Sequence, residues 1–196
     1  MKLITDGYNK IARTYLVERQ KLKTDKYVKE LIERLPDESI VLDVGCGAGV
    51  PVDDALLRRG FGVVGIDTSE EQIKMARKLC KGGDYMVRDI NLLIENEYQV
   101  DAVVCLYTMF HIPREQHRKM LAIFASFLKK GGCLLLTMGD RDFEGEHEML
   151  GTKMWSSQWG REKNTKMVVD SGFEILKDEI NTTASERHQV ILAIRK

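Results

Sequence analysis

The sequence predicts an α/β protein with three layers, in which a mainly parallel sheet lies between helices on both faces. Short apolar runs bounded by turn residues alternate along the chain with segments whose apolar residues recur at helical spacing. Such alternation is typical of βαβ units, because their crossover helices cover both faces of the sheet. The 196 residues contain no internal repeat or low-complexity tract, so a single domain is expected.

Apolar runs predict the strands, and amphipathic segments predict the helices between them. The expected strands cover residues 40–44, 61–66, 85–87, 100–106, 133–138, 173–180 and 189–194. The expected helices cover residues 52–59, 70–80, 114–129 and 162–170. Before the first strand, apolar residues recur at helical spacing as far as Pro36, where a helix cannot continue, so an N-terminal helical region is expected.

Capping and turn residues mark several helix ends. Ser69 and Gln72 have the spacing of a capping box at the start of the helix over 70–80. Gly60 and Gly131 are placed to end the helices over 52–59 and 114–129. Pro113 suits the first turn of the latter helix.

Composition disfavours several classes of protein. Lys+Arg and Asp+Glu each total 30, and this zero net charge disfavours a protein that mainly grips nucleic acid or anionic membrane. The longest apolar run, residues 102–112, is too short to span a bilayer, and no secretory leader is visible. The cysteines match neither a zinc site nor a disulfide framework, so reduced cysteines in a cytoplasmic protein are expected. They are Cys46, Cys80, Cys105 and Cys133.

A glycine-rich loop follows the first expected strand. Asp43 lies near the end of that strand, and Gly45, Gly47 and Gly49 follow it in a Gly-x-Gly-x-Gly pattern. Alternating glycines permit a tight turn and let a ligand approach the backbone, at the strand end where α/β proteins bind ligands. The spacing differs from the Gly-x-Gly-x-x-Gly of dinucleotide sites. Asp43 could attract a ligand ammonium group, directly or through water.

Two further acids end the next two strands. Asp67 could accept hydrogen bonds from both hydroxyls of a ribose, because one carboxylate has two acceptor oxygens. Asp89 could accept from an exocyclic amino group such as that of adenine, with Ile90 packed on the base. The structural alternatives are a solvated turn residue for Asp67 and a helix cap for Asp89. Acids at three consecutive strand ends favour a nucleoside-binding site.

Several segments resemble one family. Residues 41–67 resemble motif I and the following acidic motif of class I S-adenosylmethionine-dependent methyltransferases. Residues 83–89 are similar to the family's adenine motif, and residues 100–105 and 128–134 to its fourth strand and the lead into its fifth. Residues 8–15 are similar to the Tyr-Asp-x-x-Ala-x-x-Tyr opening of small-molecule members related to quinone-biosynthesis methyltransferases, with Asn9 in place of Asp.

The resemblance implies a Rossmann-like fold with seven strands, the last antiparallel to the rest. It implies S-adenosylmethionine as cofactor, with the methionine end at Asp43 and the glycine loop, the ribose at Asp67 and the adenine at Asp89. The single domain would comprise an N-terminal helical cap (1–36), a cofactor-binding core (37–139), a substrate lid (140–160) and a C-terminal helix with strands (161–196). The expected cofactor-binding residues are Tyr8, Tyr15, Asp43, Gly45, Cys46, Gly47, Gly49, Asp67, Thr68, Asp89, Ile90, Leu106 and Tyr107.

The methyl acceptor is expected beside the loops after the fourth and fifth strands. His111 is the candidate general base, which an alcohol acceptor would need. A histidine that orders the loop before a helix is the equal alternative. In the expected lid, the candidate substrate residues are Asp140, His147, Met154 and Trp155. No metal site is expected, because surface acids with one histidine are usually solvated.

A small-molecule acceptor is favoured over protein or RNA. Residues 107–110 read Tyr-Thr-Met-Phe, where many nucleic-acid methyltransferases carry Asn-Pro-Pro-aromatic. Two other functions remain open. A nicotinamide-dependent reductase would share the glycine loop and the ribose acid, although not the glycine spacing. A module that binds S-adenosylmethionine without turnover is the second, because the acceptor side is the less defined half.

Overall fold

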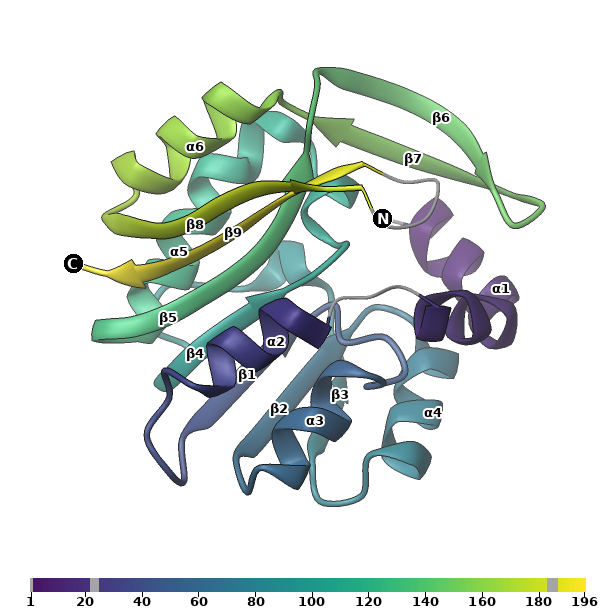
Figure 1. The fold of residues 1–196 in the computed structure, drawn as a ribbon. Helices are drawn as coiled ribbons and strands as arrows, with labels where there is room; N and C mark the ends of the chain where they lie inside the picture. Colours follow the sequence, from purple (N-terminus) through teal and green to yellow (C-terminus); the bar gives the residue numbers. More distant parts are fainter. Residues whose placement is uncertain (1, 22–24, 183–186) are drawn as a thin grey trace.

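The computed structural model describes residues 2–21, 25–182 and 187–196, and a seven-stranded sheet forms its centre (Figure 1). The strand order is β3-β2-β1-β4-β5-β9-β8. Strands β1 to β5 are parallel, whereas β9 is antiparallel to both of its neighbours. The predicted fold class is therefore confirmed, and the last strand lies inside the sheet rather than at its edge. The strands are β1 (Ile40–Val44), β2 (Gly62–Asp67), β3 (Asp84–Val87), β4 (Val100–Cys105), β5 (Leu128–Gly139), β8 (Phe173–Asn181) and β9 (His188–Arg195).

Helices cover both faces of this sheet, because neighbouring residues of each strand point to opposite faces. Val41 and Val104 pack with α2 and α3 on one face. Leu42 and Val103 pack with α5 and α6 on the other face. The helices are α1 (Lys2–Lys21), α2 (Asp25–Ile32), α3 (Val52–Arg58), α4 (Glu70–Leu79), α5 (His117–Phe127) and α6 (Arg161–Asp170), with short 3-10 turns η1 (Ile90–Leu92), η2 (Met109–His111) and η3 (Arg114–Gln116).

The end of α5 is the main departure from the expected boundaries. The helix was expected over residues 114–129 with Gly131 marking its end, but residues 114–116 form the separate turn η3, which follows Pro113. The placement of the helix end at Gly131 was wrong. Leu128 is already extended and pairs with Val100 of β4, so the chain enters the sheet before it reaches the glycine. Gly131 instead takes a φ of +82° where the β4–β5 register shifts.

The capping box at α4 is only half formed. The Ser69 hydroxyl accepts from the Gln72 backbone N–H at 3.2 Å, as predicted. The Ser69 backbone N–H, however, donates to Asp67 at 2.8 Å instead of to the Gln72 side chain. Asn9 of α1 completes the cap, because its Oδ1 accepts from the Ser69 hydroxyl at 2.7 Å. The helix end is thereby joined to a distant segment of the chain.

The segment expected as a lid is a β-hairpin formed by β6 (Phe143–Met149) and β7 (Thr152–Gln158). Leu150 and Gly151 connect the strands with φ values of +50° and +72°, the signs required by a tight type I′ turn. Helix α1 packs against β7, and Met154 is buried there with Ile4 and Ile11 (Figure 1).

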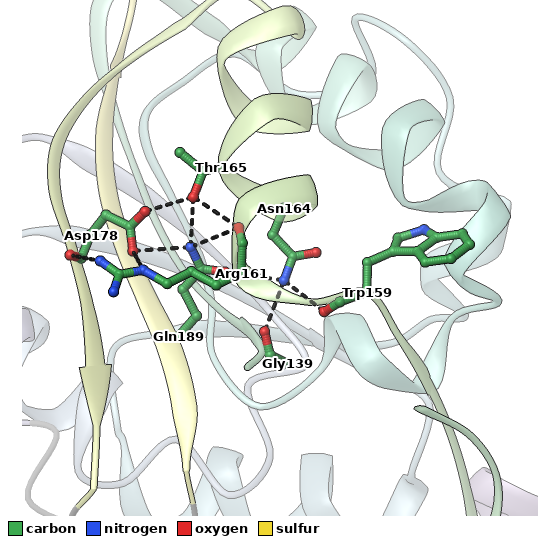
Figure 2. A network of polar contacts seen from close by, with 7 residues as sticks. All are labelled: Gly139, Trp159, Arg161, Asn164, Thr165, Asp178 and Gln189. Carbon is green, nitrogen blue, oxygen red and sulfur yellow. Dashed lines mark hydrogen bonds and ion pairs between the residues drawn. The ribbon is translucent and has the colours of Figure 1, made fainter. Parts of the chain in front are cut away.

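A polar network fixes the base of the hairpin to α6 and the sheet (Figure 2). Asn164 Nδ2 donates to the carbonyl oxygens of Gly139 at 2.8 Å and Trp159 at 3.0 Å, the residues on either side of the hairpin segment. The same nitrogen donates to Gln189 Oε1 at 3.1 Å, and Gln189 donates to Asp178 at 3.0 Å. One buried side chain therefore holds both ends of the hairpin. Among the described residues, no helix combines the length and apolarity needed to cross a membrane.

Candidate active site

A cavity lies at the carboxyl ends of the parallel strands, where the fold class predicts a ligand site. It encloses about 910 Å³ of space outside protein atoms, open solvent at its mouth included. Its floor is formed by the loop after β1 and by the ends of β2, β3 and β4, and its roof is formed by α1. Most of the residues expected to bind a cofactor line this one cavity.

The glycine loop takes a backbone conformation in which residues with a side chain would be strained. Gly45, Gly47 and Gly49 have φ values of +78°, +55° and +77°. A Cβ on Gly45 would lie 2.0 Å from Thr108 Oγ1, and one on Gly49 would lie 2.7 Å from Cys80 Sγ. A Cβ on Gly47 would meet only the Gln72 side chain, at 3.7 Å, because this glycine faces the cavity. The loop therefore leaves its backbone accessible to a ligand.

Asp67 joins the end of β2 to this loop. Its carboxylate accepts from the Gly47 N–H at 3.0 Å and from the Ser69 N–H at 2.8 Å, so both oxygens are held in place. Burial raises the pKa of Asp67, and these backbone hydrogen bonds oppose that rise. Each carboxylate oxygen has a second lone pair, so the group can still accept from two neighbouring hydroxyls.

Asp43 lies beneath the loop beside a second buried acid, Asp53, which the sequence reading did not single out. The two residues are 3% and 0% exposed. Burial is the main cause that raises the pKa of each, and the pKa of Asp53 is raised further by the charge of Asp43. The charge of Arg19 acts in the opposite direction on the pKa of Asp43. The floor of the cavity therefore favours a positively charged ligand group.

The adenine region differs from the expectation in one residue. Ile90 and Arg88 line the cavity, but Asp89 lies outside its lining. Asp89 Oδ1 accepts from the backbone and side-chain nitrogens of Asn91, both at 2.8 Å, so it caps η1. The structure thus shows the capping alternative for this acid, and an adenine contact would have to use its other oxygen.

Tyr107 follows β4 and has a strained backbone conformation at the inner wall of the cavity. Its φ is +58°, and its backbone N–H donates to Thr137 Oγ1 at 2.5 Å. Backbone strain in a non-glycine residue is found preferentially at functional sites. The Arg19 guanidinium carbon lies 4.0 Å from the centre of the Tyr107 ring. Leu106 and Thr68 also line the cavity, as expected.

His111 lies under the roof and hydrogen-bonds to two distant segments. Its Nε2 is 2.8 Å from the Tyr8 hydroxyl of α1, and its Nδ1 is 2.9 Å from the Trp155 carbonyl oxygen of β7. A carbonyl only accepts, so Nδ1 carries the hydrogen and the bare Nε2 accepts from Tyr8. Burial lowers the pKa of His111 to about 4, so the imidazole is neutral near pH 7.

Tyr8 connects this histidine to the cavity. It lies against Tyr15 with ring centres 5.1 Å apart, and both rings line the cavity. Burial, with the neighbouring Tyr15 as a smaller cause, raises the pKa of Tyr8 well above its usual value. The phenol therefore stays protonated and donates to His111. The Tyr8 hydroxyl and the neutral His111 imidazole are thus hydrogen-bonded to each other at one side of the cavity.

The four candidate substrate residues do not line the cavity. Asp140 pairs with Arg187 at 2.9 Å, and His147 lies on β6 opposite Met154. Met154 is fully buried under α1, and Trp155 reaches the site only through its carbonyl oxygen. The hairpin therefore supports α1 and His111 instead of forming a wall of the cavity.

Arg19, Gln72 and Thr108 are among the lining residues that the sequence did not identify as part of the site. Arg19 follows Tyr15 by one helical turn and lies on the same face of α1, so helical spacing could have identified it. Gln72 is 1% exposed, and neither of its side-chain polar atoms has a partner among the described residues. Thr108 follows Tyr107, and no local signal marks it. The orphaned amide and the open face of Gly47 are features that a polar ligand such as a nucleoside would satisfy.

Comparisons with known proteins agree with this geometry. A family model for a methyltransferase domain matches residues 41–132. The ubiquinone biosynthesis O-methyltransferase of Xanthomonas axonopodis pv. citri is 36% identical over 121 residues, which are 59% of this chain and 48% of that protein. The corresponding protein of Coxiella burnetii is 32% identical over 108 residues, which are 53% of this chain and 45% of that protein. The chain thus spans about half the length of these curated relatives.

A solved structure shares the fold over nearly the whole chain. Magnesium protoporphyrin IX methyltransferase from Synechocystis PCC 6803, solved with bound S-adenosylmethionine, superimposes with a TM-score of 0.70 at 22% identity. The match covers 98% of this chain and 95% of that one. At this identity the structural similarity supports the shared fold alone. The similarity to methyltransferases in sequence rests on the matched domain model and on the two relatives. The matched domain model, the relatives and the shared fold together support a class I S-adenosylmethionine-dependent methyltransferase.

Proposed function

We propose that this chain transfers a methyl group from S-adenosylmethionine to an acidic hydroxyl, phenolic or enolic, of a small molecule. The observation that carries the proposal is the juxtaposition in one cavity of the glycine loop with the Tyr8–His111 pair. Both curated relatives are O-methyltransferases by name, which supports oxygen as the acceptor atom. A cavity roofed by α1 favours a small acceptor over a segment of a polymer.

The floor of the cavity would hold the cofactor. Asp67 would accept hydrogen bonds from the ribose hydroxyls, Asp43 would attract the ammonium group, and Ile90 would contact the adenine. Gly47 would allow close approach, since the space on its cavity side is open. When bound, S-adenosylmethionine supplies a methyl group made electrophilic by its sulfonium. The residues of the chain would then align the acceptor and exclude water.

Tyr8 and His111 would take the proton from the acceptor. In this proposal the acceptor hydroxyl donates to Tyr8 Oη. Its proton moves to Tyr8 while the Tyr8 proton moves to Nε2 of His111, which leaves a nucleophilic oxygen on the acceptor and a protonated imidazole. A buried imidazole whose pKa is lowered to about 4 is a weak base. The acceptor hydroxyl must therefore be acidic, which selects phenols and enols over aliphatic alcohols.

The proposal is tested by incubating the protein with S-adenosylmethionine and a panel of acceptors. The panel contains catechols and hydroxyquinols, aliphatic alcohols of similar size, primary amines, a mixed peptide library and transfer RNA. Mass spectrometry measures S-adenosylhomocysteine and the methylated product in each arm. O-methylation confined to the phenolic and enolic arm is the expected result. Preferred methylation of amine, peptide or RNA would overturn the acceptor assignment, and no transfer to any acceptor would favour a binding module.

A further inference from the structure

The proposed function leaves one buried acid without a role. Asp53 lies in the first turn of α3 and is fully buried. An acid at the start of a helix is usually stabilised by the free backbone N–H groups there. Neither carboxyl oxygen of Asp53, however, has a hydrogen-bond donor in the described part of the chain. An ionised Asp53 would therefore be a buried charge without compensation, which is costly.

Asp53 cannot ionise independently of Asp43, the acid beside it beneath the glycine loop. Burial raises the pKa of Asp53, and the charge of Asp43 and a hydrogen bond to that carboxyl raise it further. Two buried carboxyls in contact hold one proton between them, because the charge of one disfavours ionisation of the other. The pair is therefore expected to carry one negative charge at neutral pH.

The surroundings of the two carboxyls differ, and they determine which one keeps the proton. Asp43 lines the cavity, and the positive charge of Arg19 favours its ionised form. Asp53 lies outside the cavity lining. The other groups beside Asp53 have raised pKa values and are uncharged at pH 7; they are Cys46 of the loop, Cys80 after α4 and the Tyr85 hydroxyl of β3.

We propose that Asp53 keeps its proton at neutral pH and donates it in a hydrogen bond to Asp43. A protonated carboxyl has one O–H to donate, whereas an ionised one only accepts. The bond would leave Asp43 ionised and fixed in orientation at the cavity, where it attracts the ligand ammonium. Asp53 is then a positioning residue, which acts on the ligand only through Asp43. This inference rests on the proposed function, which assigns Asp43 to the ammonium group of S-adenosylmethionine.

Infrared spectroscopy of the ligand-free protein tests the proton directly. A protonated carboxyl has a C=O stretching band above the backbone amide bands, and an ionised carboxylate has none there. At pH 7 the difference spectrum between the unchanged protein and Asp53→Asn should contain this band. The control is Asp54→Asn, at the neighbouring acid that pairs with Arg58 on the surface, and its difference spectrum should lack the band. A difference spectrum without the band for Asp53→Asn would overturn the proposal.

Calorimetric titration with S-adenosylmethionine tests the positioning role. Asp53→Asn retains a donor for Asp43, whereas Asp53→Leu has a similar size and no donor. Burial raises the pKa of Asp43 to about 6, and the bond from Asp53 opposes that rise, so the pKa should be higher in Asp53→Leu. Arg19 and Asp67, the other charges that act on Asp43, are unchanged in both variants.

At pH 7 Asp53→Leu should therefore bind S-adenosylmethionine about 10-fold more weakly than Asp53→Asn, the scale of one charge-assisted hydrogen bond. The difference should shrink as the pH is raised, because Asp43 then ionises without a donor. Equal affinities, or a difference that is the same at every pH, would overturn the positioning role. Thermal unfolding of each variant identifies any loss of folding. An unchanged protein that shows the infrared band but binds no S-adenosylmethionine would contradict the proposed function instead, so the two failures are distinguishable.

Discussion

The floor and the roof of the cavity are built in different ways. The floor is backbone: the loop after β1 turns through three positive-φ glycines, and Asp67 holds it by accepting from Gly47, 20 positions away. The roof is held by side chains from distant parts of the chain. Tyr8 reaches His111 across 103 positions, and His111 reaches Trp155 across 44.

This difference separates two kinds of substitution. A change in the floor alters a backbone path that the sheet itself depends on, so stability and cofactor affinity should fall together. A change in the roof removes a side-chain contact from α1 or the hairpin, and the sheet beneath it remains intact. A substitution at His111 or in the hairpin should therefore affect chemistry on the acceptor more than binding of the cofactor.

The largest effect is expected for His111→Gln. Loss of the base should lower the rate of methyl transfer by about 10²- to 10³-fold, the usual range for general-base catalysis. The affinity for S-adenosylmethionine should change by less than about threefold, since hydrogen-bond losses at a partner outside the ligand contribute little to its binding. Steady-state kinetics and calorimetry measure the two quantities. Equal losses of rate and affinity would contradict the claim that His111 serves the chemistry and not the binding of the cofactor.

Gly45→Ala tests the floor. The new Cβ would meet Thr108 Oγ1 at 2.0 Å in a backbone with a φ of +78°, so the free energy of unfolding should fall by about 2–4 kcal/mol. Gly131→Ala is the matched control, because its φ is +82° and its Cβ would meet nothing within 4 Å. That control should lose only about 1 kcal/mol. Denaturant unfolding of both variants measures the difference, and equal losses would mean that the close approach at Gly45 is unimportant.

The buried histidine of the roof predicts a dependence of stability on pH. The pKa of His111 is lowered to about 4 from a usual value of 6.5, so the unfolded chain takes up the proton first as the pH falls. The contribution of the neutral His111 side chain to the free energy of unfolding is complete above pH 6.5 and is lost as the pH falls towards 4. Between pH 7 and 4.5 the stability of the protein relative to His111→Gln should therefore decrease by about 2 kcal/mol. A difference that is constant over this range would contradict the burial of a neutral imidazole.

The smallest of these effects is expected at the base of the hairpin. Asn164→Ala removes the donor shared by the Gly139 and Trp159 carbonyl oxygens. The free energy of unfolding should therefore fall by about 1–2 kcal/mol. Lys166→Ala on the exposed side of the same helix is the control, and its surface pair with Asp170 should contribute little. Methyl transfer should fall in Asn164→Ala because the hairpin positions His111. Unchanged stability in that variant would show that the network does not hold the hairpin.

The floor could be predicted because its signals are local. The three glycines, Asp43 and Asp67 follow one another at strand ends, and strand ends meet in a parallel sheet whatever the rest of the chain does. Asp89 is the exception. Its position at a strand end predicted a ligand contact, but the Asn91 backbone N–H, only two residues away, donates to its carboxylate instead. The expectation for His111 combined a role at the acceptor with a role in ordering a loop, and its contacts are compatible with both.

The roof could not be predicted because long-range pairs define it. The hairpin turns at Leu150–Gly151, and leucine is an unusual residue for a positive φ, so no turn signal precedes the glycine. The apolar side chains of β7 that resembled a substrate wall are used to bury α1, as Met154 shows. Helical spacing places Arg19 on the same face of α1 as Tyr15. Its position over the Tyr107 ring, however, arises only in the folded chain and could not be predicted from that spacing.

Calorimetric titration of the unchanged protein with S-adenosylmethionine, with nicotinamide adenine dinucleotide titrated in parallel, tests whether the cavity is a methyl-donor site. A single site of micromolar affinity for the sulfonium cofactor and no binding of the dinucleotide are expected. Binding of the dinucleotide in its place, or no binding of S-adenosylmethionine, would contradict the assignment of the cavity as a methyl-donor site.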